Sequence, residues 1–497
     1  MQKIFLNKIN FKLFPSSKPK YNPILFFDKE EDLYKNKGFL YLDKNIQGYI
    51  KKIFKKIEKF EFYHLVLAEK SIFFAKLDEK ILSSSKNFSI FVRKLFKFLH
   101  NSREENFSLS FEDLHNDLHY FELFVINFVI SNFNFAEVYK NIDNKDKNEI
   151  KNIEIFVNKK YLSDYKNRLK KAIIIGEEIN RARYLSNLPG GDLTPSIFVD
   201  VSKEIAKELD LKIKILEEKD LEKIKAGGLL GVSKGSKEKP FLVILENKNK
   251  GKEISLIGKG ITFDTGGLHI KIADAMNEMH LDVSGAASVL ASTLVIKKLN
   301  IPVNLVTFIP LAENMISGES YRPGDILKTI SGKTIEVGSP DAEGRIILAD
   351  AIDYSKKFYK PNLIITLATL TGAAMVALGT KAAAIFSNNR DLERFFLETS
   401  EKTFDSLWPL PLWEDYKKDI EAPFADIWNI GKTRWGGAIH GAMFLYEFAK
   451  PNNFVHIDMA PRMTATEDDV LNKGSLGFGV YLFEKIFENY KDLYDLI

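Results

Sequence analysis

The chain has 497 residues, which is too many for one ordinary domain and indicates two or three. Its net charge of +4 is small for this length, so we expect neither nucleic acid nor an anionic membrane as the main partner. It contains no cysteine, which excludes disulfide bonds, a thiolate nucleophile, cysteine-bound zinc and iron–sulfur clusters.

The first twenty residues do not have the pattern of a signal peptide. Residues 1–20 place lysines among the apolar side chains at short intervals and lack an uninterrupted apolar stretch. Elsewhere no run approaches the roughly 18 consecutive apolar residues expected of a membrane span. We therefore expect a cytoplasmic protein.

Residues 1–159 are rich in Lys and Phe and poor in Gly, with mixed helix and strand patterns and no motif of known chemistry. We predict a smaller N-terminal α/β domain here. In residues 160–190, apolar side chains from Leu162 to Leu185 recur largely at helical spacing, and Pro189 with Gly190 ends the pattern. This segment is predicted to be a connecting helix.

Residues 191–497 alternate short apolar strands with helical stretches, the pattern of a sheet covered by helices. We predict a catalytic α/β/α domain with a central mixed sheet. The predicted strands are 241–245, 253–257, 303–309 and 362–368, the predicted helices are 284–299 and 345–358, and 258–267 is predicted to be a loop. The polar residues of interest then lie where strands end, which is where open α/β sheets bind ligands.

Four carboxylates lie in glycine-rich segments among apolar neighbours. They are Asp264, Asp282, Asp341 and Glu343. Carboxylates gathered in a site with little water repel one another unless protons or cations compensate them. Two divalent metal ions compensate the charge and also supply hydrolytic chemistry, because together they activate a water and polarise a carbonyl.

Three basic residues are interleaved with these acids, namely Lys259, Lys271 and Arg345. For any one acid, a structural ion pair with such a cation is the simpler interpretation. The density of glycines and charges over residues 259–345 favours a metal site when the residues are taken together, since glycine permits unusual backbone shapes and close approaches.

Several motifs resemble the leucyl aminopeptidase family of dinuclear metallopeptidases. The strongest are 258–267 (GKGITFDTGG), 279–287 (MHLDVSGAA) and 341–345 (DAEGR). Weaker matches follow in the family's order and spacing over about residues 180–485, at 312–315, 321–325, 368–373, 426–431, 456–460 and 474–479.

The resemblance implies a role for each residue of the cluster. The implied metal ligands are Lys259, Asp264, Asp282, Asp341 and Glu343, with Asp264 and Glu343 bridging two ions. In the family, a bicarbonate held at the position of Arg345 acts as general base on the water or hydroxide that bridges the ions. Lys271 matches the position that stabilises the oxyanion. A lysine ligand must be neutral, so nearby cations must depress its pKa.

The resemblance further implies an exopeptidase that removes N-terminal residues from peptides as a homohexamer, a dimer of trimers. The ligand set suits Mn or Zn, among other divalent ions. Small or apolar residues match the pocket for the first side chain, which predicts a preference for Leu or Met; they are Met279, Thr369, Gly372, Ala460 and Met463.

The sequence departs from the family pattern at three places near the ligands. His280 stands where a basic residue is usual, Val283 where methionine is usual, and Ser339-Pro340 where Asn-Thr is usual. No ligand is lost. Pro340 removes a backbone donor and stiffens the chain beside Asp341, so we expect an effect on metal affinity or exchange.

Two other functions were weighed. Residues 231–235 fit the G-x-S-x-G pattern of a serine hydrolase with Ser233 as nucleophile, but that motif needs a strand before it and a helix after it. The other is DNA binding by the basic N-terminal third as an added role, since some members of the family bind DNA; the small net charge argues against it.

Three further signals were set aside. His115 and His119 are spaced for one helix face, but the zinc-protease motif requires Glu where Asn116 stands. Gly258 and Gly260 follow a strand as in dinucleotide-binding loops, without the third glycine of that motif. His456, beside Asp458, is interpreted as a hydrogen-bonded structural histidine.

Overall fold

The structure is a computed structural model that describes residues 9–15, 19–68, 70–140 and 149–497. Its contacts divide the chain into a first unit, Met1–Glu177 with Thr466–Asn472, and a second unit, Glu178–Ala465 with Lys473–Ile497. The division falls inside helix α6 (Leu162–Asn187), the helix expected within residues 160–190. That residues 1–159 form a domain of their own stays a prediction. Residues 1–8 and 16–18, part of the segment expected not to be a signal peptide, lie outside the described residues.

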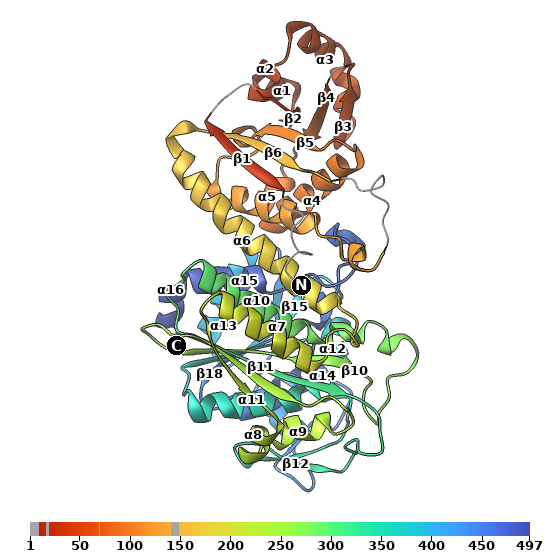
Figure 1. Cartoon of the computed structure of the whole chain (residues 1–497), viewed down its shortest axis with the longest axis vertical. Coiled ribbons are helices and arrows are strands. Elements are labelled where there is room, and N and C mark those ends of the chain that lie inside the picture. The colour runs from red at the N-terminus through yellow and green to blue at the C-terminus, as the bar shows by residue number, and fades with distance from the viewer. Residues whose placement is uncertain (1–8, 16–18, 69, 141–148) are drawn as a thin grey trace. The chain divides into compact units, whose positions relative to one another are not determined.

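The first unit is built on a sheet of six described strands (Figure 1). Their order is β1-β6-β5-β2-β4-β3, and neighbours are parallel except β3 and β4. The strands are β1 (Asn10–Pro15), β2 (Asn22–Phe27), β3 (Phe62–Val66), β4 (Ser71–Lys76), β5 (Asn106–Ser110) and β6 (Asn152–Val157).

Helices cover both faces of this sheet because successive side chains of a strand point to opposite faces. Phe74 of β4 belongs to a buried cluster with Phe54 of α3, whereas its neighbour Phe73 packs edge-on against Phe98 of α4. The helices are α1 (Glu30–Lys35), α2 (Lys37–Leu40), α3 (Lys44–Ile57), α4 (Ser85–Asn101) and α5 (Leu118–Ser131). The first unit is therefore α/β, as predicted.

The second unit contains a mixed sheet of nine strands. Its main path is β16-β15-β18-β14-β9-β11-β8-β7, and β10 pairs with β11. The strands β18, β14, β9 and β11 are mutually parallel, and β10 is parallel to β11. The strands are β7 (Lys212–Leu216), β8 (Phe241–Asn247), β9 (Ile254–Gly258), β10 (Gly260–Asp264), β11 (Leu305–Asn314), β14 (Leu363–Ala368), β15 (Ala383–Ser387), β16 (Leu407–Pro409) and β18 (Asn453–Asp458).

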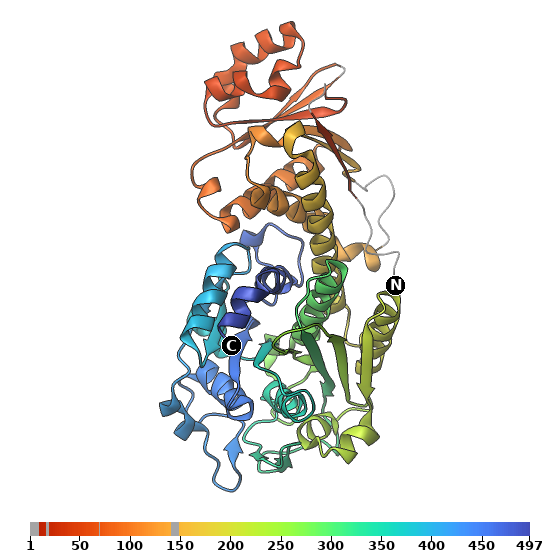
Figure 2. The same ribbon diagram turned by 90° about the vertical axis from the view of Figure 1, so that its left-hand side faces the viewer.

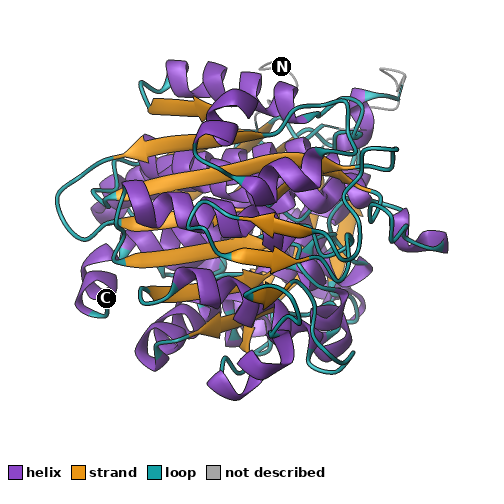
Figure 3. Ribbon diagram, turned by 90° about the horizontal axis from the view of Figure 1, so that it is seen from below, coloured by secondary structure: helices purple, strands orange, loops and turns teal. Residues whose placement is uncertain are grey.

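Helices lie on both sides of these strands, so the second unit has three layers (Figures 2 and 3). Helices α9, α11 and α14 share one buried apolar cluster with the sheet. Helix α10 packs on β9 and β11 and contacts α15. The helices are α7 (Pro195–Glu208), α8 (Glu218–Lys223), α9 (Gly227–Ser233), α10 (Ser284–Lys298), α11 (Gly344–Phe358), α12 (Gly372–Leu378), α13 (Arg390–Glu401), α14 (Gly437–Ala449), α15 (Val480–Glu488) and α16 (Tyr490–Asp495). The predicted α/β/α architecture with a central mixed sheet is confirmed.

A small three-stranded sheet is anchored to α11 by a buried carboxylate. It contains β12 (Ile326–Lys328), β13 (Thr334–Glu336) and β17 (Ile427–Trp428). Asp350 of α11 accepts hydrogen bonds from the backbone N–H of Leu229 at 2.8 Å and of Ile330 at 3.1 Å. Burial raises the pKa of Asp350 to about 7 despite these donors.

Two helical stretches are long and apolar enough to cross a membrane by composition alone. They are Leu118–Val138 and Ala273–Lys298, and 56% and 89% of their most apolar windows are buried inside the protein. Core helices of soluble proteins share this character, so the two stretches are weak evidence for a membrane span.

The predicted loop 258–267 was wrong in part, because Gly260–Asp264 forms strand β10. The strand is short and bounded by glycines, which obscured its pattern. Gly260 also brings β10 close to β11, since a Cβ there would lie 2.5 Å from the carbonyl oxygen of Pro310. Asp264 therefore ends a strand instead of lying within a loop.

Candidate metal centre

The carboxyl ends of the parallel strands bring the polar residues to one edge of the sheet. Lys259 follows β9 directly, Asp264 is the last residue of β10, and Thr369 follows β14 directly. At the ends of their strands, Asp264 pairs in register with Asn314 of β11, and Ala368 of β14 pairs with Asp458 of β18.

Asp282 and Glu343 reach the same edge from helix ends. Asp282 lies in a short 3₁₀ helix (Met279–Val283) that leads into α10, and Glu343 immediately precedes α11. The sequence predicts a loop at Asp282, where the structure has this 3₁₀ helix, because so short a turn has no apolar period to reveal it. Gly344 lets the start of α11 approach Lys259: a Cβ at that glycine would lie 2.4 Å from Lys259 Cε.

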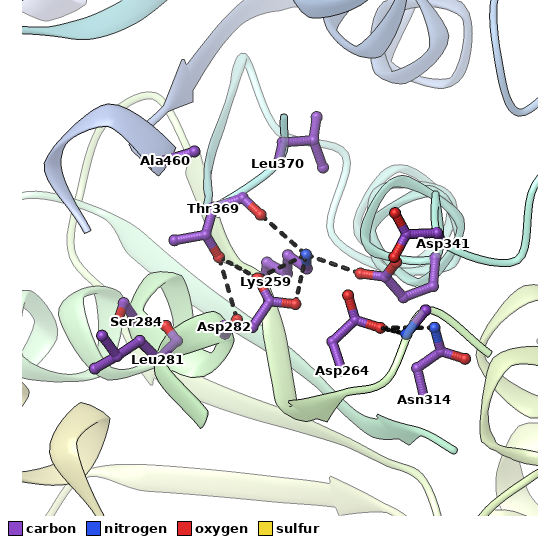
Figure 4. Close-up of polar contacts among 12 residues, drawn as sticks. Lys259, Asp264, Leu281, Asp282, Ser284, Asn314, Asp341, Thr369, Leu370 and Ala460 are labelled. Atoms are coloured by element: carbon purple, nitrogen blue, oxygen red, sulfur yellow. Dashed lines mark hydrogen bonds and ion pairs between the residues drawn. The ribbon is translucent and has the colours of Figure 1, made fainter. Parts of the chain in front are cut away.

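Lys259 is the centre of a buried polar cluster (Figure 4). Its Nζ lies 2.8 Å from an oxygen of Asp282 and 2.8 Å from Oε1 of Glu343, and it donates to the carbonyl oxygen of Thr369 at 2.9 Å. The Thr369 hydroxyl donates to Asp282 Oδ1 at 2.6 Å. Two acids and one cation, all nearly inaccessible to solvent, are thus held in direct contact.

Lys271 joins the other two acids. Its Nζ lies 2.8 Å from Oδ2 of Asp264 and 2.5 Å from Oδ1 of Asp341. Asp264 is buried, whereas the Asp341 side chain is 40% exposed, so Asp341 is the outermost of the four carboxylates. The four acids and two lysines predicted as one cluster are brought together.

Burial and the charges of their neighbours shift the pKa values of these groups. Burial, and then the charge of Asp264, raise the pKa of Glu343 to about 8. Burial also raises the pKa of Asp282 and Asp341. Burial alone would lower the pKa of Lys259, but the surrounding carboxylates outweigh it and hold that pKa above its usual value.

The donor set fits divalent metal ions. Oxygen atoms of Asp264, Asp341 and Glu343 lie within 4.8 Å of one another. Oε2 of Glu343 is buried and has no hydrogen-bond partner in the described part of the chain, which is costly for a carboxylate oxygen unless a cation lies beside it. Carboxylate oxygens with one amine nitrogen and no thiolate are ligands for Mn, Zn or similar ions.

Arg345 lies in the first turn of α11, close to the acids but paired with none of them. Its Nη1 donates to the carbonyl oxygen of Asn429 at 2.8 Å, and its buried Nε has no hydrogen-bond partner among the residues that the structure describes. Burial lowers the pKa of Arg345 to about 10, with Glu343 and Asp458 opposing that shift. The guanidinium therefore stays charged at neutral pH and retains a free donor.

The segment 339–341, which departs from the family pattern, is held in part by three side chains for which the sequence predicts no role. Asn429 Nδ2 donates to the Ser339 carbonyl at 2.7 Å. The other two side chains meet at Pro340. Asn314 Nδ2 donates to the Pro340 carbonyl at 3.1 Å, and the Tyr321 hydroxyl donates to the same oxygen at 2.6 Å. Asn314 Nδ2 also donates to Asp264 Oδ1 at 2.8 Å. Asn314 and Tyr321 occur in the weaker family motifs, 312–315 and 321–325, which were the available signal.

The residues predicted to form the substrate pocket lie on three segments. Met279 begins the 3₁₀ helix of Asp282; Thr369 and Gly372 lie where β14 leads into α12; Ala460 and Met463 begin and follow a second 3₁₀ helix (Ala460–Arg462) after β18. Helix α12 packs against this second 3₁₀ helix. Figure 4 shows Ala460 near Thr369 and Leu370, above Lys259.

Ser233 does not sit on a strand-to-helix elbow. It ends α9, and its hydroxyl donates to the carbonyl oxygen of Leu230 at 3.0 Å.

The histidines set aside have structural partners. His115 precedes α5, so it does not share a helix face with His119 as the spacing suggested. His456 is buried and bonds Thr366 Oγ1 at 2.8 Å, and burial lowers its pKa to about 3, as suits a structural histidine.

Comparison with known proteins agrees with this fold. The sequence model of the cytosol aminopeptidase family, catalytic domain, matches residues 180–483. The chain belongs to this family of α/β proteins.

Relatives described as probable cytosol aminopeptidases come from several bacteria. The protein of Chlorobaculum tepidum is 42% identical over 316 residues, 63% of this chain and 62% of that protein. The protein of Nitrosococcus oceani is 44% identical over 290 residues, 58% of each. The protein of Chlorobium limicola is 39% identical over 357 residues, 71% of this chain and 70% of that protein. The chain thus spans about three fifths of the first two relatives.

Proposed function

We propose that the protein is a metal-dependent aminopeptidase that hydrolyses the N-terminal peptide bond of peptides. The observation that carries the proposal is the convergence of four carboxylates on Lys259 and Lys271, with one buried oxygen of Glu343 left unpaired. As a purely structural feature such a cluster contributes little stability, because the cost of removing charges from water offsets much of their attraction. Family membership and the descriptions of the relatives support the same activity.

We assign the metal ligands as Lys259, Asp264, Asp282, Asp341 and Glu343. When bound, two divalent ions supply charge compensation, activation of a water and polarisation of the scissile carbonyl. Mn or Zn suits the donors best. Lys259 must give up its proton to act as a ligand; the carboxylates that now raise its pKa would face the ions instead, and the positive charge nearby would favour the neutral amine.

Lys271 and Arg345 are the proposed catalytic cations. The Lys271 ammonium, on the more exposed side of the cluster, would stabilise negative charge that develops on the carbonyl oxygen of the substrate. Arg345 would hold a bicarbonate that accepts a proton from the attacking water. The unpaired Nε of Arg345 supports this role, because a buried guanidinium with a free donor is suited to a small anion.

The first side chain of the peptide would lie against Met279, Thr369, Gly372, Ala460 and Met463. These residues are apolar or small, which favours Leu or Met at the N-terminus. Gly372 supports the assignment because a Cβ built there meets nothing within 4 Å, so open space lies in front of it.

We also propose a cytoplasmic homohexamer, with residues 1–159 forming an N-terminal domain and 191–497 the catalytic domain. These proposals rest on resemblance to the family. Sedimentation of the purified protein tests the assembly, and a hexamer that forms without residues 1–159 would assign its contacts to the catalytic domain.

Metal removal tests the central proposal. The full-length protein is dialysed against a chelator, assayed on leucine amide, and assayed again after addition of Mn²⁺ or Zn²⁺. We expect activity to be lost and then restored, with about two metal ions bound per chain by elemental analysis. Hydrolysis that is insensitive to the chelator would contradict the proposal.

The variant Glu343→Ala tests the ligand assignment. Loss of this proposed metal ligand should abolish activity and reduce bound metal. The matched control is Glu122→Gln in the first unit, where a carboxylate with 0% exposure pairs with Arg168 at 2.7 Å. This control removes an equally buried charge and should leave metal content and kcat unchanged. Full activity with two bound metals in Glu343→Ala would refute the assignment.

A further inference from the structure

Asp458 is a buried carboxylate at the place where two pocket-bearing loops separate. It is the last residue of β18, its register partner Ala368 is the last residue of β14, and it is 0% exposed. One more backbone bond, from Met459 N–H to the Ala368 carbonyl at 2.8 Å, continues the pairing. Beyond it, the two chains diverge into the segments that carry Thr369 to Gly372 and Ala460 to Met463.

The carboxylate of Asp458 holds both segments. Its Oδ1 accepts the backbone N–H of Leu370 at 3.1 Å from one segment and that of Ala460 at 3.1 Å from the other. Its Oδ2 accepts the Thr371 hydroxyl at 2.6 Å. Thr371 in turn caps α12, because its Oγ1 accepts the N–H of Ala374 at 3.1 Å. One side chain therefore fixes both segments at their bases.

A further tie between these segments lies at their far side. Arg462 Nη1 donates to the carbonyl oxygen of Thr380, just past α12, at 2.6 Å. Along the chain, Gly372 and Ala460 lie on the stretches between these two ties, and we assign them to one face of the pocket. The width of that face depends on the separation of the loops, because neither residue has a side chain long enough to adjust to a substrate.

We infer that Asp458 is a specificity-positioning residue, which sets the width of the pocket for the first side chain by joining the loop after β14 to the loop after β18. The inference rests on the proposed function, since it deepens the assignment of these loops to the pocket. Asp458 contacts no proposed metal ligand by any hydrogen bond among the described residues. Its loss should therefore alter substrate selection while the metals stay bound.

The test compares Asp458→Ala, Asp458→Asn and the unaltered protein. For each, kcat and KM are measured on the amides of leucine, methionine and alanine, together with metal content. In Asp458→Ala the ratio of kcat/KM for leucine to that for alanine should fall on the order of tenfold, because a loosened apolar pocket loses discrimination of that size. Metal content should equal that of the unaltered protein.

Asp458→Asn provides the rescue. Its carbonyl oxygen can still accept from Leu370 and Ala460, and its amide can donate to the Thr371 hydroxyl. The leucine-to-alanine ratio should return to within about threefold of the original. In Asp458→Asn, kcat could fall equally for all three amides while the leucine-to-alanine ratio stays at the value of the unaltered protein. That result would reflect the missing charge near Arg345, and it counts as rescue. An Asn variant as unselective as the Ala variant would overturn the inference.

A second variant covers the case in which Asp458→Ala does not fold. Thr371→Ala removes the donor to Oδ2 and the cap of α12 while the carboxylate stays, and should shift the ratio in the same direction by a smaller factor. An unchanged ratio in a folded Asp458→Ala, or in Thr371→Ala if the former does not fold, overturns the inference.

Failure of the proposed function is recognised separately. An unaltered protein that carries two metals but does not cleave the amides contradicts the aminopeptidase proposal. The inference is then decided by calorimetric titration with free leucine and free alanine: a preference for leucine that weakens in Asp458→Ala supports it, and equal binding of the two amino acids by the unaltered protein overturns it.

Discussion

Asn314 donates its side-chain amide to Asp264, at 2.8 Å, from the register position directly opposite on the neighbouring strand. The same amide nitrogen reaches the Pro340 carbonyl beside Asp341. One neutral side chain thereby links two of the proposed metal ligands, which lie more than seventy residues apart in the sequence.

Replacement of Asn314 by Asp should weaken metal binding. The variant is nearly isosteric, but it removes both donors and sets a fifth carboxylate against Asp264, so neighbouring ligands lose their orientation. We expect metal affinity, measured by titration of the chelator-treated protein, to fall by roughly 10- to 100-fold. Tyr321→Phe, which removes only the second donor to Pro340, is the control and should have a smaller effect. Equal affinities in all three proteins would show that Asn314 does not orient the ligands.

Replacement of Lys271 by Ala should change catalysis and metal affinity in opposite directions. The ammonium competes with divalent ions for the carboxylates of Asp264 and Asp341, so its removal should tighten metal binding. The loss of oxyanion stabilisation should lower kcat by roughly 100-fold or more. Titration calorimetry and steady-state kinetics measure the two effects. If Lys271 only neutralised the acids, the variant would keep its kcat.

Replacement of Arg345 by Ala should lower turnover and leave both metals bound. Addition of bicarbonate should stimulate the unaltered protein, whereas the variant should not respond because the proposed anion site is gone. The expected loss in kcat is on the order of 100-fold. Arg345→Lys keeps a positive charge but loses the forked donors, so it should recover little activity. A variant that still responds fully to bicarbonate would place the anion elsewhere.

Asp350 should make stability decrease with rising pH. Its folded-state pKa is about 7, above the value near 3.9 expected in the unfolded chain, so the native state binds the extra proton between these values. The contribution of the protonated carboxyl is fully present near pH 4 and is lost as pH rises through about 7. Its full size is a few kcal/mol by order of magnitude, at roughly 1.4 kcal/mol per pKa unit.

The measurement compares thermal unfolding of the unaltered protein and Asp350→Asn at a series of pH values. The pH dependence of stability that comes from the other acids with a raised pKa is the same in both proteins, so it cancels in the difference. Asparagine lacks the second acceptor for Leu229 or Ile330, so the variant should be less stable near pH 4. Its deficit should shrink towards pH 7, because only the unaltered protein must ionise a buried group. A deficit that is constant or grows would contradict the raised pKa.

Much of the fold could be predicted because the apolar periodicity of long helices and strands is visible in the sequence. The long apolar period before Pro189 predicted a helix within residues 160–190, and α6 occupies Leu162–Asn187. The strands at 253–257 and 362–368 appear as β9 and β14. The sequence could not reveal β10, whose five residues are bounded by glycines, or the 3₁₀ helix of Asp282. Such short elements are defined by tertiary contacts, here with β11 and α10, and not by local pattern.

The members of the cluster could likewise be predicted, whereas the residues that hold it could not. Acids and lysines near glycines are visible one by one in the sequence. The contacts of Asn314 with Pro340, or of Asp458 with two loops, depend on which strands become neighbours. The order of residues in the sequence does not show which strands are neighbours in the sheet.

Thr369 belongs both to the buried cluster around Lys259 and to the proposed substrate pocket. Its carbonyl oxygen accepts from Lys259 and its hydroxyl donates to Asp282, while it is also assigned to the wall that meets the substrate. A substitution there that alters peptide preference also disturbs the ligands, so this wall has little freedom to diverge. Differences in substrate preference among related enzymes should therefore accumulate at Met279 and Met463, because their thioether side chains do not hydrogen-bond to the acids.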